Sequence, residues 1–260
     1  MIITCLLENT TQNAELTAEH GLSLYIETEE SKILFDMGQS EAFLSNAEKL
    51  AVDLSQVDFA ILSHGHYDHG GGLKAFLDIN KTAPVYVSRH AFGAHYNGTE
   101  KYIGLDVSLL NSDRLIFVGD ELLITENARL FSCNGMPRAH GLGAFGLTIK
   151  ENGVFKPDPF LHEQYLLLEE NGKKVLISGC SHKGIMDIVS CFAPDVLIGG
   201  FHFSKIEDEK TLDNAVSILN GFETQYYTCH CTGEMQYTFM KQSRPNLHYL
   251  SCGETLVYPV

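Results

Sequence analysis

Four potential metal ligands lie close together in the segment Ser63–Gly71: His64, His66, Asp68 and His69. Imidazole nitrogens and carboxylate oxygens are good ligands for first-row divalent metals. The adjacent glycines let the backbone bend sharply, so one loop can aim His64 and His66 at one point and Asp68 and His69 at a neighbouring one. Because four such side chains on one loop have no packing explanation, the segment predicts a metal site.

The elements around this loop must hold it in place. The apolar run Phe59–Leu62 directly precedes the loop and is typical of a buried strand, and a helix is expected through Leu73–Leu77. The rest of the first half is expected to be rich in strands, with β-like alternation from Leu115 to Ile149. The other expected elements are strands at Ile2–Leu7, Leu22–Glu27, Lys32–Phe35 and Pro84–Ser88, and a helix at Ser40–Leu50.

The second half resembles the first in the order of its elements. Paired strands are expected at Tyr165–Leu168 and Lys174–Ile177, joined by the turn Asn171-Gly172. Further expected elements are helices at Lys183–Phe192, at 212–219 and at Thr232–Lys241, and strands at Val196–Ile198 and Gln225–Thr228. Strands mixed with helices in both halves predict two β-rich sheets packed together, with helices outside.

The composition argues against several classes of protein. The 260 residues include 18 Lys+Arg and 33 Asp+Glu, and the net charge of −15 disfavours a nucleic-acid groove, which needs a basic face. No apolar run approaches the roughly 18 residues of a membrane helix, and the N-terminus lacks the features of a signal peptide, so no membrane partner is expected. The seven cysteines form an odd set without regular spacing, which favours a reducing compartment and predicts a cytoplasmic protein. The oligomeric state stays open, a homo-oligomer included.

The loop residues His64 to His69 match the HxHxDH signature of the metallo-β-lactamase superfamily, and Leu34–Gly38 resembles its early LFD-x-G strand and turn. The resemblance extends over nearly the whole chain and implies a single domain over residues 1–260. It also implies an α+β fold, an αββα sandwich of two mixed β-sheets with helices on the outer faces. The expected metal site is dinuclear and lies at one edge of the two sheets.

The same resemblance implies three more ligands from distant strand ends: His162, Cys180 and His230. The implied first site consists of His64, His66 and His162, with His140 as the competitor of His162. The implied second site consists of Asp68, His69 and His230, with Cys180 on the second metal or between the two. Because thiolate is a soft ligand that favours zinc over manganese or magnesium, two zinc ions are expected, with iron or manganese as the alternative.

Residues near these ligands are candidates for substrate binding and proton transfer. Ser181, His182 and Lys183 lie at the mouth of an expected helix, where free N–H groups and the lysine could hold a phosphate or carboxylate. His202 follows an expected buried strand and is predicted to bind substrate or transfer a proton, and His20 is expected in the same cleft. Asp68 can orient the nucleophile, and His182 or His202 can protonate the leaving group. The remaining histidines at 90, 95 and 248 have no spacing relationship to the loop and are predicted to be structural or surface residues.

Several segments resemble one branch of the superfamily, the dihydropterin ribofuranosyl-aminobenzene 5′-phosphate synthases. These are Glu19–Leu24, Ser178–Ile185, Gly199–Phe203 and His230–Gly233. The leading hypothesis is a zinc-dependent hydrolase that uses a metal-bound hydroxide on a small anionic substrate. The alternatives are a synthase-like transferase, an iron-dependent redox protein, and a non-catalytic metal-bound sensing module.

Overall fold

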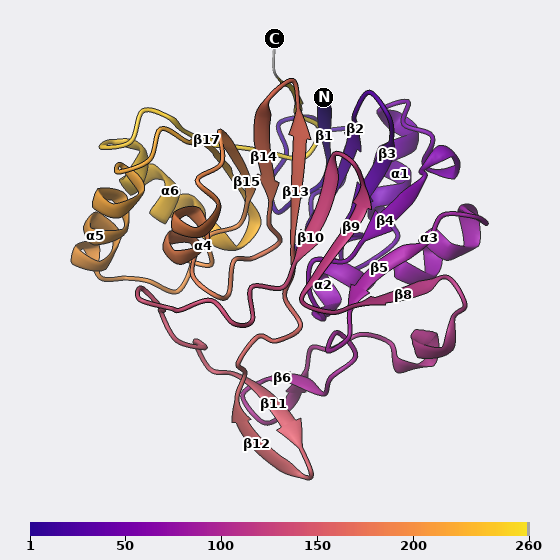
Figure 1. The fold of residues 1–260 in the computed structure, drawn as a ribbon, viewed down its shortest axis with the longest axis horizontal. Coiled ribbons are helices and arrows are strands. Elements are labelled where there is room, and N and C mark those ends of the chain that lie inside the picture. The colour runs from indigo at the N-terminus through magenta and orange to yellow at the C-terminus, as the bar shows by residue number, and fades with distance from the viewer. Residues whose placement is uncertain (259–260) are drawn as a thin grey trace.

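The computed structural model describes residues 1–258 and has two large β-sheets packed face to face, with helices on both outer sides (Figure 1). Apart from its last strand, residues 2–118 supply the strands of one sheet, and residues 121–249 supply those of the other. The last strand crosses back, since Ile2 pairs with Val257, and this brings the two ends of the chain together. None of the helices in the described part of the chain combines the length and the apolarity that a bilayer crossing demands.

The first sheet has seven strands and is antiparallel at one end and parallel at the other. From edge to edge it contains β18 (Thr255–Val257), β1 (Ile2–Leu7), β2 (Ser23–Glu27), β3 (Lys32–Phe35), β4 (Phe59–Ile61), β5 (Val85–Ser88) and β8 (Leu115–Val118). Its outer face carries α1 (Ala42–Lys49) and α3 (Leu73–Ile79), with the single turn α2 (Tyr67–Gly70) and the short 3-10 turns η1 (Leu54–Gln56) and η2 (Val107–Asn111) nearby. The helix expected at Ser40–Leu50 is therefore confirmed with slightly shorter bounds.

The second sheet also has seven strands, four of them parallel. In order these are β17 (Leu247–Tyr249), β16 (Gln225–Thr228), β15 (Val196–Gly199), β14 (Lys173–Ile177), β13 (Tyr165–Glu170), β10 (Ala128–Phe131) and β9 (Glu121–Thr125). Its outer face carries α4 (Ile185–Phe192), α5 (Glu209–Leu219) and α6 (Glu234–Lys241), and η3 (His230–Thr232) follows β16. The hairpin expected across Asn171-Gly172 is confirmed, since Glu170 pairs with Lys173.

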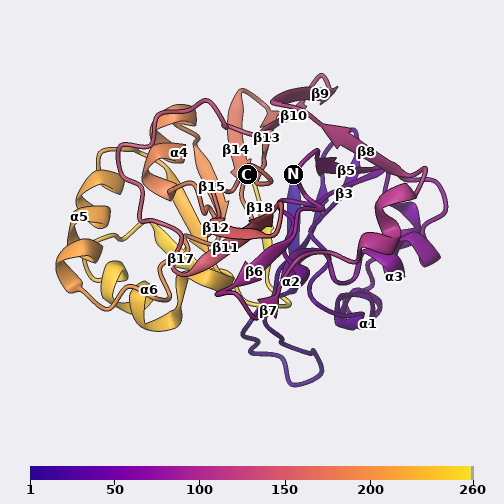
Figure 2. The same ribbon diagram turned by 90° about the horizontal axis from the view of Figure 1, so that it is seen from below.

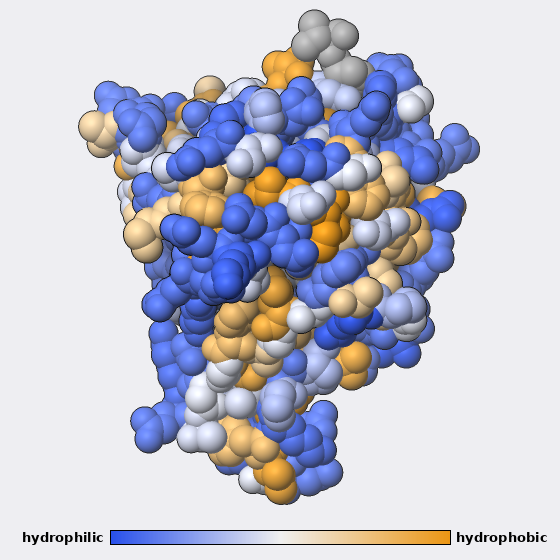
Figure 3. Space-filling view, turned by 90° about the vertical axis from the view of Figure 1, so that its left-hand side faces the viewer, coloured by the Kyte–Doolittle hydropathy of each residue, from blue (hydrophilic) through white to orange (hydrophobic). Residues whose placement is uncertain are grey.

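Three apolar layers hold the sandwich together. The central layer lies between the sheets and includes Ile26 and Ile33 from the first sheet and Leu166 and Ile177 from the second, all fully buried. One outer layer packs α1 and α3 on the first sheet, and the other packs the α4–α6 helices on the second. The expected αββα sandwich is thus confirmed. The face that the α4–α6 layer presents to solvent is largely hydrophilic, broken by hydrophobic patches (Figure 3).

A third, small sheet lies outside the sandwich and was not expected from the sequence. It contains β12 (Val154–Pro157), β11 (Leu147–Glu151), β6 (His95–Asn97) and β7 (Lys101–Tyr102). Figure 2 shows it across the end of the sandwich where the two large sheets meet. Its strands are short and most of their side chains are half-buried or exposed, so hydrophobic periodicity indicates them only weakly.

The topology brings many loops to one edge of the sandwich. Strands β3, β4 and β5 run parallel in the first sheet, and β14, β15 and β16 run parallel in the second. The carboxyl ends of parallel strands meet at the same edge of a sheet, and ligand sites form there. The loops after β3, β4, β14, β15 and β16 carry most of the residues that the sequence singled out.

Candidate metal centre

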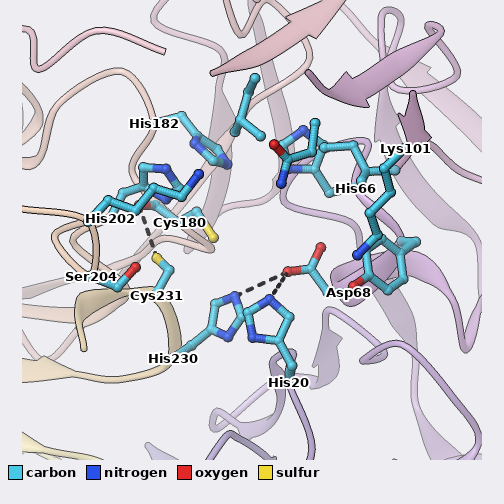
Figure 4. A pocket seen from close by; sticks show the side chains of 15 residues that line it. His20, His66, Asp68, Lys101, Cys180, His182, His202, Ser204, His230 and Cys231 are labelled. Carbon is cyan, nitrogen blue, oxygen red and sulfur yellow. Dashed lines mark hydrogen bonds and ion pairs between the residues drawn. The ribbon is translucent and has the colours of Figure 1, made fainter. Parts of the chain in front are cut away.

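The loops at this edge surround a pocket of about 160 Å³ that the small sheet covers on one side (Figure 4). Histidines, one carboxylate and two thiols line it together with two exposed lysines. The lining residues are His20, His66, Tyr67, Asp68, Asn97, Lys101, Ile103, Leu147, Cys180, His182, His202, Ser204, Lys205, His230 and Cys231. The pocket therefore brings together residues that lie more than 200 positions apart in the sequence.

The turn after β4 is shaped by close backbone contacts. A Cβ atom at Gly65 would lie 2.0 Å from the carbonyl oxygen of Ala91, so only glycine fits there. A Cβ atom at Gly179 would lie 2.1 Å from the Ser63 hydroxyl, so the loop after β14 also packs tightly against this turn. These contacts place His64 and the loop after β14 beside each other.

The first group of candidate ligands is His64, His66 and His182, whose donor atoms lie within 4.8 Å of one another. The Nε2 atoms of His64 and His182 are 3.3 Å apart. Burial and the neighbouring imidazoles hold the pKa values of all three well below the usual range, so each is a neutral ring with a free lone pair. Three neutral imidazoles aimed at one point fit a divalent cation.

The structure disagrees with the grouping predicted for His162. This side chain joins His66, His95 and Asp158 instead of His64. Its Nδ1 accepts a hydrogen bond from the Gly65 N–H at 2.9 Å, so in the neutral ring Nε2 carries the proton and has no lone pair to give. His182, predicted only as a substrate and proton-transfer residue, takes the expected place of His162 beside His64. His140 does not line the pocket.

The second group centres on His69. The Nε2 atom of His69 lies 3.2 Å from the Nε2 atom of His230 and 3.2 Å from the Sγ atom of Cys180. His230 Nε2 is 3.4 Å from Asp68 Oδ2, and the partly exposed His20 is 3.2 Å from the same oxygen (Figure 4). The predicted second set of Asp68, His69, His230 and Cys180 is therefore brought together, with His20 beside it.

Buried hydrogen bonds orient the rings of this second group. Asp36, which follows β3, accepts from His69 Nδ1 at 2.6 Å and from the backbone and hydroxyl of Ser63 at 2.7 Å each. Asn9 Oδ1 lies 2.8 Å from His230 Nδ1. Burial disfavours charge on His69, but Asp36 and Asp68 outweigh it and raise the pKa of His69 to about 9. Asp36 holds the Nδ1 proton of His69, so the Nε2 proton is the one that a bound cation would displace.

The donor chemistry of both groups fits metal ions. The first offers three imidazole nitrogens, and the second offers imidazoles, a carboxylate and a thiol, which are zinc ligands. Burial raises the pKa of the Cys180 thiol, so an adjacent cation is what would let it ionise. The ring nitrogens His66 Nε2, His182 Nδ1 and both of His202 are buried without hydrogen-bond partners among residues 1–258.

The anion site predicted at Ser181, His182 and Lys183 is filled by the protein itself. The Glu163 carboxylate accepts from the His182 N–H at 2.7 Å and from the Lys183 N–H at 3.0 Å. Lys183 is fully buried, and its Nζ donates to the carbonyl of Glu163 at 2.7 Å and to that of Ser132. Ser181 is also buried and bonds to Ser178. The structure therefore does not bring Ser181 and Lys183 into the pocket, since neither is among its lining residues.

The pocket also contains residues that the sequence analysis missed. Cys231 lies beside Cys180 and His202, with donor atoms within 4.8 Å. Lys101, from the small sheet, stands on the opposite wall to His202, and Lys205 also lines the pocket (Figure 4). The chain offered one signal for Cys231, its place next to His230, and none for Lys101, because the small sheet was not expected.

The loops around the pocket hold four non-glycine residues in the left-handed region. The φ angles are 60° at Asp36, 57° at Ser181, 56° at His202 and 47° at His230. Such conformations are sparsely populated and persist where the surrounding structure over-determines them, often at functional sites. Their gathering at one edge of the sandwich supports a functional role for this pocket.

Comparisons with known proteins agree with this geometry. A family model described as the metallo-beta-lactamase superfamily matches residues 16–219. The 7,8-dihydropterin-6-methyl-4-(beta-D-ribofuranosyl)-aminobenzene-5′-phosphate synthase of Methanocaldococcus jannaschii is 27% identical over 276 residues, which cover 95% of this chain and 92% of the relative. An uncharacterized protein of the same organism is 28% identical over 251 residues, which cover 93% and 94%.

A solved structure is similar over the full length. The crystal structure of Tm1679, described as a metal-dependent hydrolase of the beta-lactamase superfamily, has a TM-score of 0.86 and 30% identity and covers 100% of both chains. The family and the fold expected from the HxHxDH loop are thus confirmed. The chain belongs to the metallo-beta-lactamase superfamily.

Proposed function

We propose that this protein is a hydrolase that uses two zinc ions on a small anionic substrate. The observation that carries the proposal is the pair of adjoining donor groups on the pocket floor, one around His64 and one around His69. A purely structural zinc would need only one closed set of four ligands. Two neighbouring sets that open on a pocket are typical of a catalytic centre.

Each of the two donor groups would hold one of the two ions. His64, His66 and His182 would hold one ion, and Asp68, His69, His230 and Cys180 would hold the other. The thiol favours zinc over harder ions. When bound, zinc ions lower the pKa of water toward neutrality and stabilise negative charge that develops on the substrate.

Two side chains are suited to moving protons in this pocket. Asp68 Oδ2 faces His20 at 3.2 Å and His230 at 3.4 Å, so it can orient a nucleophilic water while it serves as a ligand. His202 lines the pocket, and neither of its ring nitrogens has a hydrogen-bond partner. A ring nitrogen of His202 is therefore free to donate a proton to the leaving group, whereas His182 is better placed as a ligand.

Positive charge at the pocket rim supports an anionic substrate. The net charge of the chain is −15, yet Lys101 and Lys205 both line this pocket. The Lys101 Nζ lies 5.4 Å from the centre of the Tyr67 ring, and the Lys205 Nζ bonds to the Phe145 carbonyl at 3.0 Å. These lysines replace Lys183 as the groups that would attract a phosphate or carboxylate. The volume of about 160 Å³ is below the roughly 300–1,000 Å³ of pockets for drug-sized ligands, which favours a small substrate.

A second candidate is a transferase that resembles the dihydropterin synthase. The 27% identity to that relative, which extends over 95% of this chain, is the observation that favours it. Both reactions would draw on the same electrostatic stabilisation of developing charge. Product analysis separates them, because a synthase joins two substrates and a hydrolase consumes water.

Metal analysis and a substrate screen test the proposal. Purified protein should contain about two zinc ions per chain by mass spectrometry, and chelation should abolish turnover that added zinc restores. The screen would cover phosphodiesters such as bis(4-nitrophenyl) phosphate, lactones, thioesters and phosphorylated pterins. Protein that neither carries nor takes up metal would overturn the proposal, and iron with a visible charge-transfer band would favour a redox protein.

Substitutions separate the proposed roles. His182→Ala should lose one zinc ion together with activity, since it removes a ligand. His202→Ala should keep both ions and lose roughly 10²–10⁴-fold in kcat, the range expected for a general acid. Wild-type turnover with normal metal content in both variants would refute these assignments.

A further inference from the structure

His66 differs from three of the other histidines of the metal centre in how its second ring nitrogen is supported. In three of the others, Nδ1 has a partner: Ser63 for His64, Asp36 for His69 and Asn9 for His230. His66 lines the pocket, but its Nε2 is buried and has no hydrogen-bond partner. Nδ1 is therefore the nitrogen left to face the pocket, and the question is what supports Nε2.

Three buried side chains lie behind His66, away from the other ligands: His95, Asp158 and His162. Their donor atoms and that of His66 all lie within 4.8 Å of one another. His95 Nδ1 is 2.7 Å from Asp158 Oδ2, and His162 Nε2 is 3.4 Å from the same oxygen. Burial disfavours charge on Asp158, but its contacts with His162 and His95 outweigh this and hold its pKa well below the usual range.

The proton positions in this group follow from two fixed partners. The Gly65 N–H can only donate, so His162 Nδ1 is an acceptor and His162 Nε2 carries the proton, which points toward Asp158. The Asp158 carboxylate can only accept, so His95 Nδ1 carries the proton of that ring. In the Nδ1–H tautomer of His95, Nε2 is the acceptor, and this atom is buried with no partner among residues 1–258.

The Nε2 atom of His66 is another unpartnered nitrogen of this group that can carry a proton, and it is not hydrogen-bonded to His95 Nε2 in this structure. When His66 Nδ1 gives its lone pair to a cation, the remaining proton lies on Nε2, where it can donate to His95. The rings of His66 and His95 are 5.7 Å apart and nearly perpendicular. We propose that His95, oriented by Asp158, is a positioning residue that accepts the His66 Nε2 proton and aims His66 Nδ1 at the metal. This inference rests on the proposed function, because it assigns a role to residues around the same centre.

The four donors could also suggest a third metal ion, but the hydrogen bonds argue against it. His162 Nε2 carries a proton and has no lone pair for a metal. One His66 ring would have to serve two ions at once, since it also belongs to the group with His64 and His182. The hydrogen bonds of Asp158 with His95 and of Gly65 with His162 orient these two rings without an ion.

Two substitutions at His95 separate positioning from packing. His95→Gln keeps an N–H that can donate to Asp158 and an oxygen that can accept from His66, whereas His95→Phe keeps a ring of similar shape and loses both. With zinc as the probe and a competing chelator, His95→Phe should lower the affinity for one of the two zinc ions by roughly 10–100-fold and leave the affinity for the other unchanged. His95→Gln should stay within about threefold of wild type, and Asp158→Asn should show an intermediate loss.

Two further measurements exclude a merely structural effect. The visible spectrum of the cobalt-substituted protein should change in His95→Phe and not in His95→Gln, and His95→Gln should unfold at a temperature similar to that of the wild type in chelator. Nitrogen-15 NMR should place a proton on Nδ1 of His95 and on Nε2 of His162. Wild-type zinc affinity in His95→Phe would overturn the inference, and so would three zinc ions per chain with one lost in that variant. A wild-type protein without any zinc affinity would refute the proposed function first.

Discussion

The two sides of the metal centre are supported in different ways. On the side of His69, one buried carboxylate, Asp36, accepts three hydrogen bonds of 2.6–2.7 Å. On the side of His182, no hydrogen bond reaches Nδ1, and the ring instead stacks on Phe160 with centroids 4.4 Å apart and planes 7° from parallel.

The difference comes from where each support lies in the fold. Asp36 and His69 follow neighbouring strands β3 and β4 of the first sheet, so the sandwich core holds that side in place. Phe160 and Asp158 lie in the connection between β12 and β13, and His95 begins β6, so the other side depends on the small sheet. We therefore expect the His69 side to be rigid. The ion on the side of His66 and His182 should be lost more easily.

The largest effect should come from Asp36→Asn. The amide removes the negative charge and cannot accept all three hydrogen bonds, so the ion at His69 should bind about 100-fold more weakly. The free energy of unfolding should also fall by about 3 kcal/mol, as for other broken buried charge networks. Zinc titration and thermal unfolding measure both. Asp78→Asn, at an exposed carboxylate, is the matched control and should change neither; retention of both ions in Asp36→Asn would show that the two supports are equivalent.

Lys183→Met should affect stability and not substrate binding. Burial lowers the pKa of Lys183 to about 8, and its Nζ caps buried carbonyl groups beside Glu163. Removal of this cation leaves the Glu163 carboxylate buried, so the free energy of unfolding should fall by about 3 kcal/mol. Denaturant unfolding and KM for the hydrolysed substrate provide the test. Lys205→Met should do the opposite, a severalfold higher KM with unchanged stability, and the reverse pattern would restore Lys183 as the substrate-binding residue.

Removal of zinc by chelator should occur in two steps. The ion held by His64, His66 and His182 should leave first, roughly tenfold faster, because its outer support lies on the small sheet. Stopped-flow release into a chromogenic chelator measures the two rates. Asp36→Asn should shrink or reverse the difference between the two release rates. A single phase in the wild type would mean that both sides release their ions at the same rate.

The smallest effect should come from Phe160→Leu. The substitution keeps an apolar side chain but removes the stack on His182, and such contacts contribute about 0.5–1.5 kcal/mol. We expect a roughly 3–10-fold lower affinity for zinc on that side, measured by the same zinc competition, with the affinity for the ion at His69 unchanged. Phe155→Leu, in the small sheet away from the pocket, should leave both affinities unchanged, so a matching loss there would trace the effect to the sheet and not to the stack.

The sequence by itself determined the family, the sandwich and the position of the ligand-rich loop. Strand bounds at Ile2–Leu7, Lys32–Phe35 and Gln225–Thr228 were predicted to the residue, because apolar runs and turn signals are carried by near neighbours in the chain. The HxHxDH loop was visible for the same reason, since its ligands lie within six residues of one another.

Only the tertiary structure decided which histidine joins which group. His64 meets His182 across 118 positions, while His162 turns away because the Gly65 N–H takes its Nδ1. The place of Lys183 was also decided by the tertiary structure, because the Glu163 carboxylate accepts from the N–H groups that a substrate was expected to use. Such choices depend on ring orientation, proton position and burial, which arise from packing between distant segments and leave no local pattern in the sequence.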